Sequence, residues 1–579
     1  MTSPALACVC FAFTTSLSAC VAPQSATNAA VVARPATDMR DLIARFEADR
    51  GAVQRLWRVE GSWQRRERMT LCMRSWIDEL AKVDFDALDQ GGRVDWILLA
   101  REARQELSAL ELEEQRWKEM AELVPFVQRI GALAEARRKL EDTDAEKAAA
   151  EVDVLAKEIA SLRAKVEEKP DRWPKSVGLR ASEAVRSLHG DLDEWYRFGK
   201  GYDPLFGWWM DQPWKAANDA LDGYAKVLRE KVAKLGGDDD KTIVGDPIGR
   251  EALVRDLAMA FIAYTPEELV QIAEREFAWC EGEMKKASRD MGFGDDWKKA
   301  LEKVKQDHVA PGAQPALIRD LSNEAVQFLE SRDLITIPSF AKESWRMEMM
   351  SPERQLVSPF FTGGEVISVS FPTDGMTHEQ KLMSMRGNNV HFSRATVHHE
   401  LIPGHHLQQY MTSRYSTWRR SFGTPFWTEG WALYWETRLW DLGFPKTPED
   451  RVGMLFWRMH RCARIRFSLG FHLGQLTPQQ CIDMLVNEVG HERDNAEAEV
   501  RRSFNGGYEP LYQCAYMLGA LQLRALQKEL VQGGRMTERQ FHDAVMTSGN
   551  MPIEMVRALL AGVALTRDYT PNWRFYPLN

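Results

Sequence analysis

Beyond its first 20 residues, the sequence lacks any apolar run near the ~18–20 residues that a membrane-spanning helix requires. It also lacks an excess of positive charge, because 75 Lys and Arg residues are mixed with 84 Asp and Glu residues, giving a net charge of −9. This balance favours binding neither to nucleic acid nor to an anionic membrane surface. We find no internal repeat and no low-complexity tract.

Cysteine is scarce beyond residue 20, and its spacing is irregular. The remaining thiols are odd in number and far apart in the sequence, so they predict neither a disulfide framework nor a cysteine-based zinc site. We expect mostly buried free thiols at these positions: Cys72, Cys280, Cys462, Cys481 and Cys514.

The N-terminus is typical of an exported protein, although it lacks the Lys or Arg that usually precedes a signal sequence. Its apolar run ends in "LSAC" (17–20), which resembles the lipobox of bacterial lipoproteins. The resemblance implies a signal peptide over 1–20 and lipidation of Cys20. Residues 21–38 are small and polar, as in a flexible tether. We therefore expect a protein on the periplasmic face of the cell envelope, in contact with the membrane only through its lipid anchor.

The rest of the chain predicts a mainly α fold. Apolar residues recur every three or four positions, as in 38–57, and the 20 tryptophans are first interpreted as helix packing in a large core. A Gly- and Asp-rich break at 235–253 divides an N-terminal helical region, 39–240, from a second region, 241–579. Short strands are expected only within 334–373, from "LITIPSF" and "GGEVISVSF".

These strands directly precede a histidine cluster, "VHHELIPGHH" (397–406). On a straight α-helix, His405 lies ~120° around the axis from His399, and His406 lies roughly 10.5 Å along it. Since zinc–nitrogen bonds are only ~2.0–2.1 Å long, neither could share a metal ion with His399. A metal site at this position therefore requires a break in the helix.

Pro403 and Gly404 predict such a break, because proline disfavours helical geometry and glycine adopts almost any backbone conformation. With these two residues looped out, the sequence has the H-E-x-x-H pattern of zinc peptidases, with His399 and His405 as ligands. His406 remains the alternative second ligand. If it is not a ligand, we expect it to face the substrate.

A third ligand is expected from "FWTEGWALYWE" (426–436). Glu429 and Glu436 are seven residues apart, so they lie on nearly one face of a helix. One can bind the metal while the other hydrogen-bonds to a histidine ligand and orients it. The tryptophans and tyrosine around them favour burial, and a buried carboxylate needs a partner or a metal.

These motifs resemble a bacterial family known as domain of unknown function 885. "HHELIPGHHLQ" and "EGWALYWE" carry the resemblance, together with segments 461–486 and 498–504. It spans about residues 400–530 and implies a metallopeptidase-like lipoprotein. It also implies that His472 faces the same cleft, as a substrate-binding residue.

A more distant resemblance is to the thimet-type oligopeptidases, which are helical zinc enzymes. It rests on the H-E-x-x-H pattern, on the two acids seven residues apart, and on "FNGGYEPLYQCAYMLG" (504–519), which is similar to a G-G-Y-x-x-x-Y segment. The resemblance implies a zincin-like, gluzincin fold. It also implies that Tyr508 or Tyr516 stabilises the transition state and that Tyr512 contacts the substrate.

We therefore expect a peptide hydrolase with one zinc ion, in which Glu400 acts as the general base. Two alternatives remain: an envelope lipoprotein that binds peptide or protein on an inactive peptidase fold, and a metal-dependent amidase of modified or cell-wall peptides. The sequence indicates no oligomeric state. Three arginines are interpreted first as solvated helix positions and second as a clamp for a substrate carboxylate: Arg461, Arg464 and Arg466.

Overall fold

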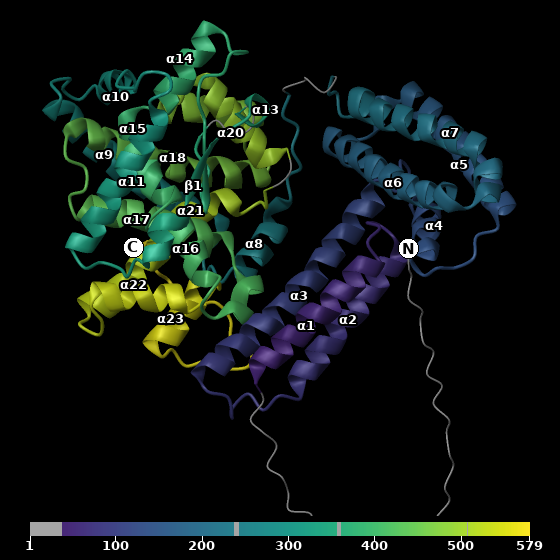
Figure 1. Cartoon of the computed structure of the whole chain (residues 1–579), viewed down its shortest axis with the longest axis horizontal. Helices are drawn as coiled ribbons and strands as arrows, with labels where there is room; N and C mark the ends of the chain where they lie inside the picture. Colours follow the sequence, from purple (N-terminus) through teal and green to yellow (C-terminus); the bar gives the residue numbers. More distant parts are fainter. Residues whose placement is uncertain (1–37, 237–241, 356–359, 506–507, 579) are drawn as a thin grey trace, which may run out of the picture. The chain divides into compact units, whose positions relative to one another are not determined.

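The computed structural model describes residues 38–236, 242–355, 360–505 and 508–578. The predicted signal peptide, Cys20 and nearly all of the predicted tether lie outside these residues. Within them, the predicted mainly α fold with one small β-sheet is confirmed (Figure 1).

The N-terminal helices begin where a short polar side chain can cap them. Asp38, Ser62, Asp89, Asp144 and Asp203 each accept a hydrogen bond from a backbone N–H in the first turn that follows. The helices of this region are α1 (Met39–Leu56), α2 (Trp63–Ala81), α3 (Gln90–Glu119), α4 (Val127–Arg138), α5 (Ala145–Glu168), η1 (Pro170–Arg172), α6 (Lys175–Tyr202), α7 (Pro204–Val227) and the π-helical η2 (Leu228–Val232).

These helices contribute to two hydrophobic cores, and the boundary between the cores does not coincide with the sequence break at 235–253. α4, α5, α6 and α7 enclose one core, and Figure 1 shows α5, α6 and α7 side by side. The apolar faces of α1, α2 and α3 belong instead to the larger core, which continues into the C-terminal helices. Residues on both sides of position 240 therefore stabilise the same core.

The C-terminal helices often begin with a capping box, in which a threonine and the third helical residue satisfy each other's backbone N–H; α9, α14, α18, α19 and α22 all do so. The helices are α8 (Gly249–Met259), α9 (Pro266–Asp290), α10 (Trp297–Lys305), α11 (Gln314–Ser331), α12 (Ser339–Ser344), α13 (Pro352–Gln355), α14 (His378–Gly387), α15 (Val390–Glu400), α16 (His405–Thr412), η3 (Thr417–Phe422), α17 (Pro425–Asp441), α18 (Pro448–His472), α19 (Pro478–Met484), η4 (Leu485–Val489), α20 (Arg493–Phe504), α21 (Tyr512–Gln527), η5 (Lys528–Gln532), α22 (Glu538–Thr547) and α23 (Ile553–Ala561).

The sheet consists of two parallel strands, β1 (Arg346–Met349) and β2 (Val366–Val369), paired in register from Arg346↔Val366 to Met349↔Val369. Ile367 and Val369 of β2 share a small core with Val397 and Leu401, next to the histidine cluster. The sheet therefore packs against the end of α15.

The strand predicted at "LITIPSF" is wrong. Thr336 donates its backbone N–H to the Asp543 side chain (2.9 Å), and α12 follows Pro338 directly, so no strand ladder forms there. The strand expected from "GGEVISVSF" is β2, and it has a neighbour on each side: β1 pairs with it along its length, and Thr362 forms a single bridge with Ser368 on the other side.

The free thiols expected from the scarce cysteines agree with the structure. Free thiols occupy all five predicted positions, and every one except the half-buried Cys72 is buried. Among the described residues, no helix is both long enough and apolar enough to span a membrane.

A buried histidine in the larger core makes stability depend on pH. His542 Nδ1 lies 2.7 Å from the Leu334 carbonyl oxygen and its Nε2 lies 2.8 Å from the Tyr434 hydroxyl, which suits the neutral imidazole. Burial lowers the pKa of His542 to about 3, whereas an unfolded histidine titrates near 6.5. The folded state therefore binds fewer protons, and the free energy of unfolding falls by about 1.4 kcal/mol per pH unit below 6.5.

We expect His542→Gln to reduce this pH dependence between pH 6.5 and 4.5, measured by denaturant unfolding at a series of pH values. The exposed His378 provides the control, because His378→Gln removes an imidazole that lies outside the core. An unchanged pH slope in His542→Gln would contradict the assignment.

Candidate metal centre and cleft

The histidine cluster spans two helices joined by a four-residue connection. α15 ends at Glu400 and α16 begins at His405. Gly404 N donates to the His398 carbonyl (3.0 Å), and the Trp431 indole N–H donates to the Pro403 carbonyl (2.7 Å). Any side chain at position 404 would place its Cβ 1.8 Å from the His399 carbonyl oxygen, so this turn requires glycine. The predicted break is confirmed, and it includes Leu401 and Ile402 as well as the Pro-Gly pair.

This connection brings together the three predicted metal ligands. Glu429 Oε2 lies 3.2 Å from His405 Nε2 and 3.7 Å from His399 Nε2, and the three ligand atoms all lie within 4.8 Å of one another. Ligands of a tetrahedral zinc ion with ~2.0–2.1 Å bonds are roughly 3.3 Å apart, so these residues fit such an ion. Glu429 Oε2 has no hydrogen-bond partner among the described residues, which leaves it available as a ligand.

Glu436, on the same helix as Glu429, orients the first histidine. His399 Nδ1 donates to Glu436 Oε1 (2.6 Å), so the other ring nitrogen, Nε2, faces Glu429 and His405. This is the carboxylate–histidine arrangement that fixes metal-binding imidazoles. Gly430 and Gly519 allow it, because a Cβ at either position would come within 2.7 Å of the opposite helix, so α17 and α21 pack very closely.

The charges at this centre shift the pKa values of its members. Burial alone would lower the pKa of His399, but the Glu429 and Glu436 carboxylates outweigh burial and raise it to about 9. Burial would raise the pKa of Glu429, but His405 and His399 hold it well below its usual range. Burial raises the pKa of Glu400. The centre thus keeps Glu429 ionised.

A cleft of about 290 Å³ opens onto the three ligand residues. Glu400 lines it beside Gly363, whose missing side chain leaves room for Glu400: a Cβ there would lie 2.4 Å from Glu400 Oε2. The sequence did not indicate the 360–363 segment as part of the site. The full lining is Phe360, Phe361, Thr362, Gly363, Thr396, His399, Glu400, His405, Gln409, Thr428, Glu429, Trp457, Arg461, Arg464, Arg502, Tyr508, Tyr512 and Tyr516.

The three predicted tyrosines line this cleft in different ways. Tyr512 donates its hydroxyl hydrogen bond to Glu429 Oε1, so it positions the proposed ligand. Tyr508 accepts a hydrogen bond from Arg502 (2.7 Å). The Tyr516 ring lies parallel to the His399 ring at 6.2 Å, and its hydroxyl makes no hydrogen bond with any described residue. Gly506 and Gly507, part of the quoted motif, lie outside the described residues.

Three other histidines do not line the cleft in the part of the chain that the structure describes. His406 Nε2 bonds to the Ala341 carbonyl (2.7 Å), which links α16 to α12. His472 is buried, and burial lowers its pKa to about 4. His398 is also buried, and neither of its ring nitrogens has a hydrogen-bond partner among the described residues.

The interpretation of Arg461 and Arg464 as solvated is wrong. Both are buried and line the cleft, whereas Arg466 pairs with Glu488 (2.5 Å) outside it. Their spacing of three residues, next to Cys462, Ala463 and Ile465, was the signal for a buried face. Arg502 joins them from α20, and no expectation from the sequence singled it out.

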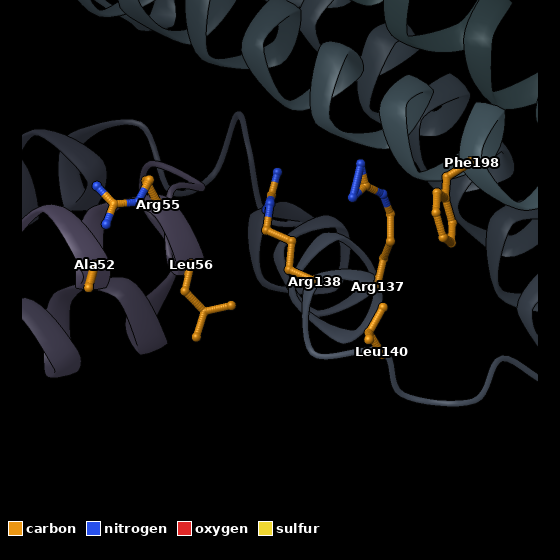
Figure 2. A pocket seen from close by; sticks show the side chains of 7 residues that line it. All are labelled: Ala52, Arg55, Leu56, Arg137, Arg138, Leu140 and Phe198. Atoms are coloured by element: carbon orange, nitrogen blue, oxygen red, sulfur yellow. The ribbon is translucent and has the colours of Figure 1, made fainter. Parts of the chain in front are cut away.

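A second cavity, of about 430 Å³, lies among α1, α4 and α6 and does not resemble a reaction site (Figure 2). Its lining contains no histidine, carboxylate, cysteine or hydroxyl group, so it offers neither a metal ligand nor a nucleophile. Its residues are Ala52, Arg55, Leu56, Arg137, Arg138, Leu140 and Phe198.

The family described as "Bacterial protein of unknown function (DUF885)" matches residues 51–560, which include the whole centre and cleft. The chain belongs to this family. The resemblance inferred from the two motifs is thereby confirmed, and it extends well into the N-terminal half. Membership in DUF885 assigns no activity, because the function of the family is unknown.

Two solved structures share the fold. A candidate lipoprotein of unknown function from Shewanella oneidensis has a TM-score of 0.68 and 16% identity, covering 91% of this chain and 100% of that one. A candidate lipoprotein from Colwellia psychrerythraea has a TM-score of 0.57 and 15% identity, covering 90% and 98%. At such identities the likeness shows the fold alone. No curated protein matches the chain.

Proposed function

We propose that this DUF885 chain is a zinc-dependent hydrolase of short peptides. The observation that carries the proposal is the convergence of His399, His405 and Glu429 on one point at the wall of a cleft. Two imidazoles and one carboxylate are a typical catalytic zinc set. Bound zinc would keep one position for water and lower the pKa of that water to about 7.

Glu400 is placed to act as the general base. It follows His399 directly, lines the cleft and forms no ion pair with a described residue. Since burial raises its pKa, its carboxylate can accept a proton from the attacking water and then release it to the departing amine. The resemblance to H-E-x-x-H peptidases supports the same role.

Tyr516 is the better placed of the two predicted oxyanion donors. Its ring stacks beside His399, and its free hydroxyl can donate to the oxygen that becomes negative when the peptide carbonyl is attacked. The Tyr508 hydroxyl already accepts from Arg502, yet it can still donate its own hydrogen. We propose Tyr516 as the principal donor and Tyr508 as a substrate contact.

The N-terminus and the relatives support a location for the proposed reaction. The lipobox-like "LSAC" and the two structural relatives described as candidate lipoproteins support lipidation of Cys20 and a place in the cell envelope. We propose that peptides present in the periplasm are the substrates. The zincin-like, gluzincin assignment belongs to this proposal.

Metal analysis combined with a peptide panel tests the proposal. We expect about one zinc per chain in the purified protein, peptide cleavage that stops after chelation, and recovery when zinc is restored. Stoichiometric zinc without cleavage of any peptide would favour the binding-only lipoprotein. Cleavage restricted to blocked or cell-wall peptides would favour the amidase. Cleavage unaffected by complete zinc removal would contradict the proposal itself.

Removal of the Glu436 carboxylate should weaken the metal site without abolishing it. Glu436→Gln keeps the side-chain size but replaces the charged acceptor that holds His399, and such changes typically cost about 10–100-fold in metal affinity. Competition with a chromogenic chelator measures this loss. Glu365→Gln, at an exposed position on the same chain, should leave the affinity unchanged.

A further inference from the structure

Three arginines gather in the wall of the cleft that holds the metal centre. Arg461 and Arg464 come from α18 and Arg502 comes from α20. We propose that these arginines bind the free α-carboxylate of a peptide substrate, so that the enzyme releases short fragments from peptide C-termini. This inference rests on the proposed hydrolase function and specifies its substrate class.

Arg461 is held rigidly but is poorly neutralised. Its guanidinium lies 5.1 Å from the centre of the Trp457 ring and 4.9 Å from that of Tyr516, so two aromatic rings hold it in place. The nearest carboxylate oxygen is Glu436 Oε1 at 3.7 Å, which already accepts from His399. Arg461 Nε has no hydrogen-bond partner among the described residues.

Arg464 and Arg502 share one further carboxylate. Arg464 Nε donates to Glu499 Oε1 (2.7 Å), and Arg502 lies 3.8 Å from Glu499 Oε2. Arg464 Nη1 has no partner among the described residues. Three guanidinium groups thus share two carboxylates, Glu499 and Glu436, and Glu436 already accepts a hydrogen bond from His399. A buried charge without a partner is costly, so the arrangement favours an anionic ligand.

The form of the site favours a carboxylate. The guanidinium fork matches a carboxylate with two parallel hydrogen bonds. The remaining walls include Phe360, Trp457 and Tyr512, which suit the side chains of a short peptide. The centre of the Tyr516 ring lies 4.4 Å from the Arg464 guanidinium and 6.2 Å from the centre of the His399 ring.

These separations set the cleavage position. Both distances are measured from the Tyr516 ring, so the Arg464 guanidinium lies within about 11 Å of the His399 ring. About three residues of extended peptide span that distance. A peptide whose terminal carboxylate is held by the arginines therefore presents one of its last few peptide bonds to Glu400 and the metal ligands. We expect products of one to three residues from the C-terminus.

Two peptides that differ only in a free or amidated C-terminus test the inference. Hydrogen bonds to charged groups contribute about 1.5–3 kcal/mol each, so kcat/KM for the acid should exceed that for the amide by roughly 10–100-fold. Arg461→Met should reduce this ratio toward one, and Arg461→Lys should restore part of it. Arg466→Met is the matched control, because Arg466 lies on the same helix but outside the cleft. A third peptide, amidated but with an acidic side chain near its end, shows whether a side-chain carboxylate can replace the terminal α-carboxylate.

Binding gives a second readout that does not require catalysis. In metal-free protein, a dipeptide acid should raise the melting temperature more than its amide does, and Arg461→Met should remove the difference. Equal kcat/KM values for the acid and the amide, or equal shifts of the melting temperature, would overturn the inference. The proposed zinc-dependent cleavage would not be affected by that result. Tighter binding of inorganic phosphate than of the dipeptide acid would also overturn it. If neither peptide is cleaved, the proposed function fails, and the melting shifts alone decide whether a carboxylate site exists.

Discussion

Purified His399→Ala protein is expected to contain no stoichiometric zinc and to cleave no peptide. His399 supplies one of three ligand atoms that lie within 4.8 Å of one another, and no other described residue extends this group to a fourth ligand. If three ligands share about 10–16 kcal/mol of zinc binding, the loss of one costs roughly 3–5 kcal/mol, or about 10²–10⁴-fold in affinity. Metal analysis after dialysis against a weak chelator measures the loss.

The neighbouring histidine offers a matched control for this experiment. His398 is buried on the same helix, but its ring nitrogens contact no metal ligand. His398→Ala removes the same number of atoms, so it reports the cost of a cavity without a lost ligand. We expect it to retain zinc after correction for any unfolded fraction. Retention of one tightly bound zinc by folded His399→Ala would show that the metal binds elsewhere.

The local parts of this structure were predictable from the sequence because short-range physics determines them. Helix starts coincide with capping residues such as Asp38 and Thr447, whose side chains bond to the next turn. The break in the histidine helix was predictable in kind, because proline and glycine at 403 and 404 disfavour a continued helix. The close approach to the His399 carbonyl explains why only glycine fits at 404.

The errors arose where tertiary contacts override local preference. "LITIPSF" has β-branched residues, but the Asp543 side chain, far along the chain, takes the Thr336 N–H that a strand would need. The strand partner of "VISV" is the charged "RMEM" segment, which shows little β propensity. Arg461 and Arg464 looked solvated because the carboxylates nearest to them, Glu436 and Glu499, lie on other helices.

The predicted metal ligands could be identified from sequence because their spacing is local. His399 and His405 lie on either side of one turn, and Glu429 precedes Glu436 by two helical turns. The sequence could not choose between His405 and His406. The structure favours His405, because the His406 ring bonds to Ala341 instead. The segment that lines the cleft beside Glu400, residues 360–363, has no motif and became visible only in three dimensions.

Glu400→Gln should separate metal binding from chemistry. The glutamate lines the cleft but is not among the three grouped ligands, and glutamine has nearly the same shape. We expect the variant to retain stoichiometric zinc and its melting temperature. Its kcat should fall by about 10²–10⁴-fold, the usual contribution of a general base, because an amide cannot accept the proton of the attacking water.

The same measurement on Glu365→Gln shows whether the removal of any acidic side chain lowers kcat. This exposed residue pairs with Arg346 and does not line the cleft. A Glu400→Gln enzyme that holds zinc and retains more than about a tenth of wild-type kcat would show that another group moves the proton. A Glu400→Gln enzyme that loses zinc would instead place Glu400 among the ligands. Only retained zinc together with lost turnover agrees with a base that acts on water from the cleft side of the metal centre.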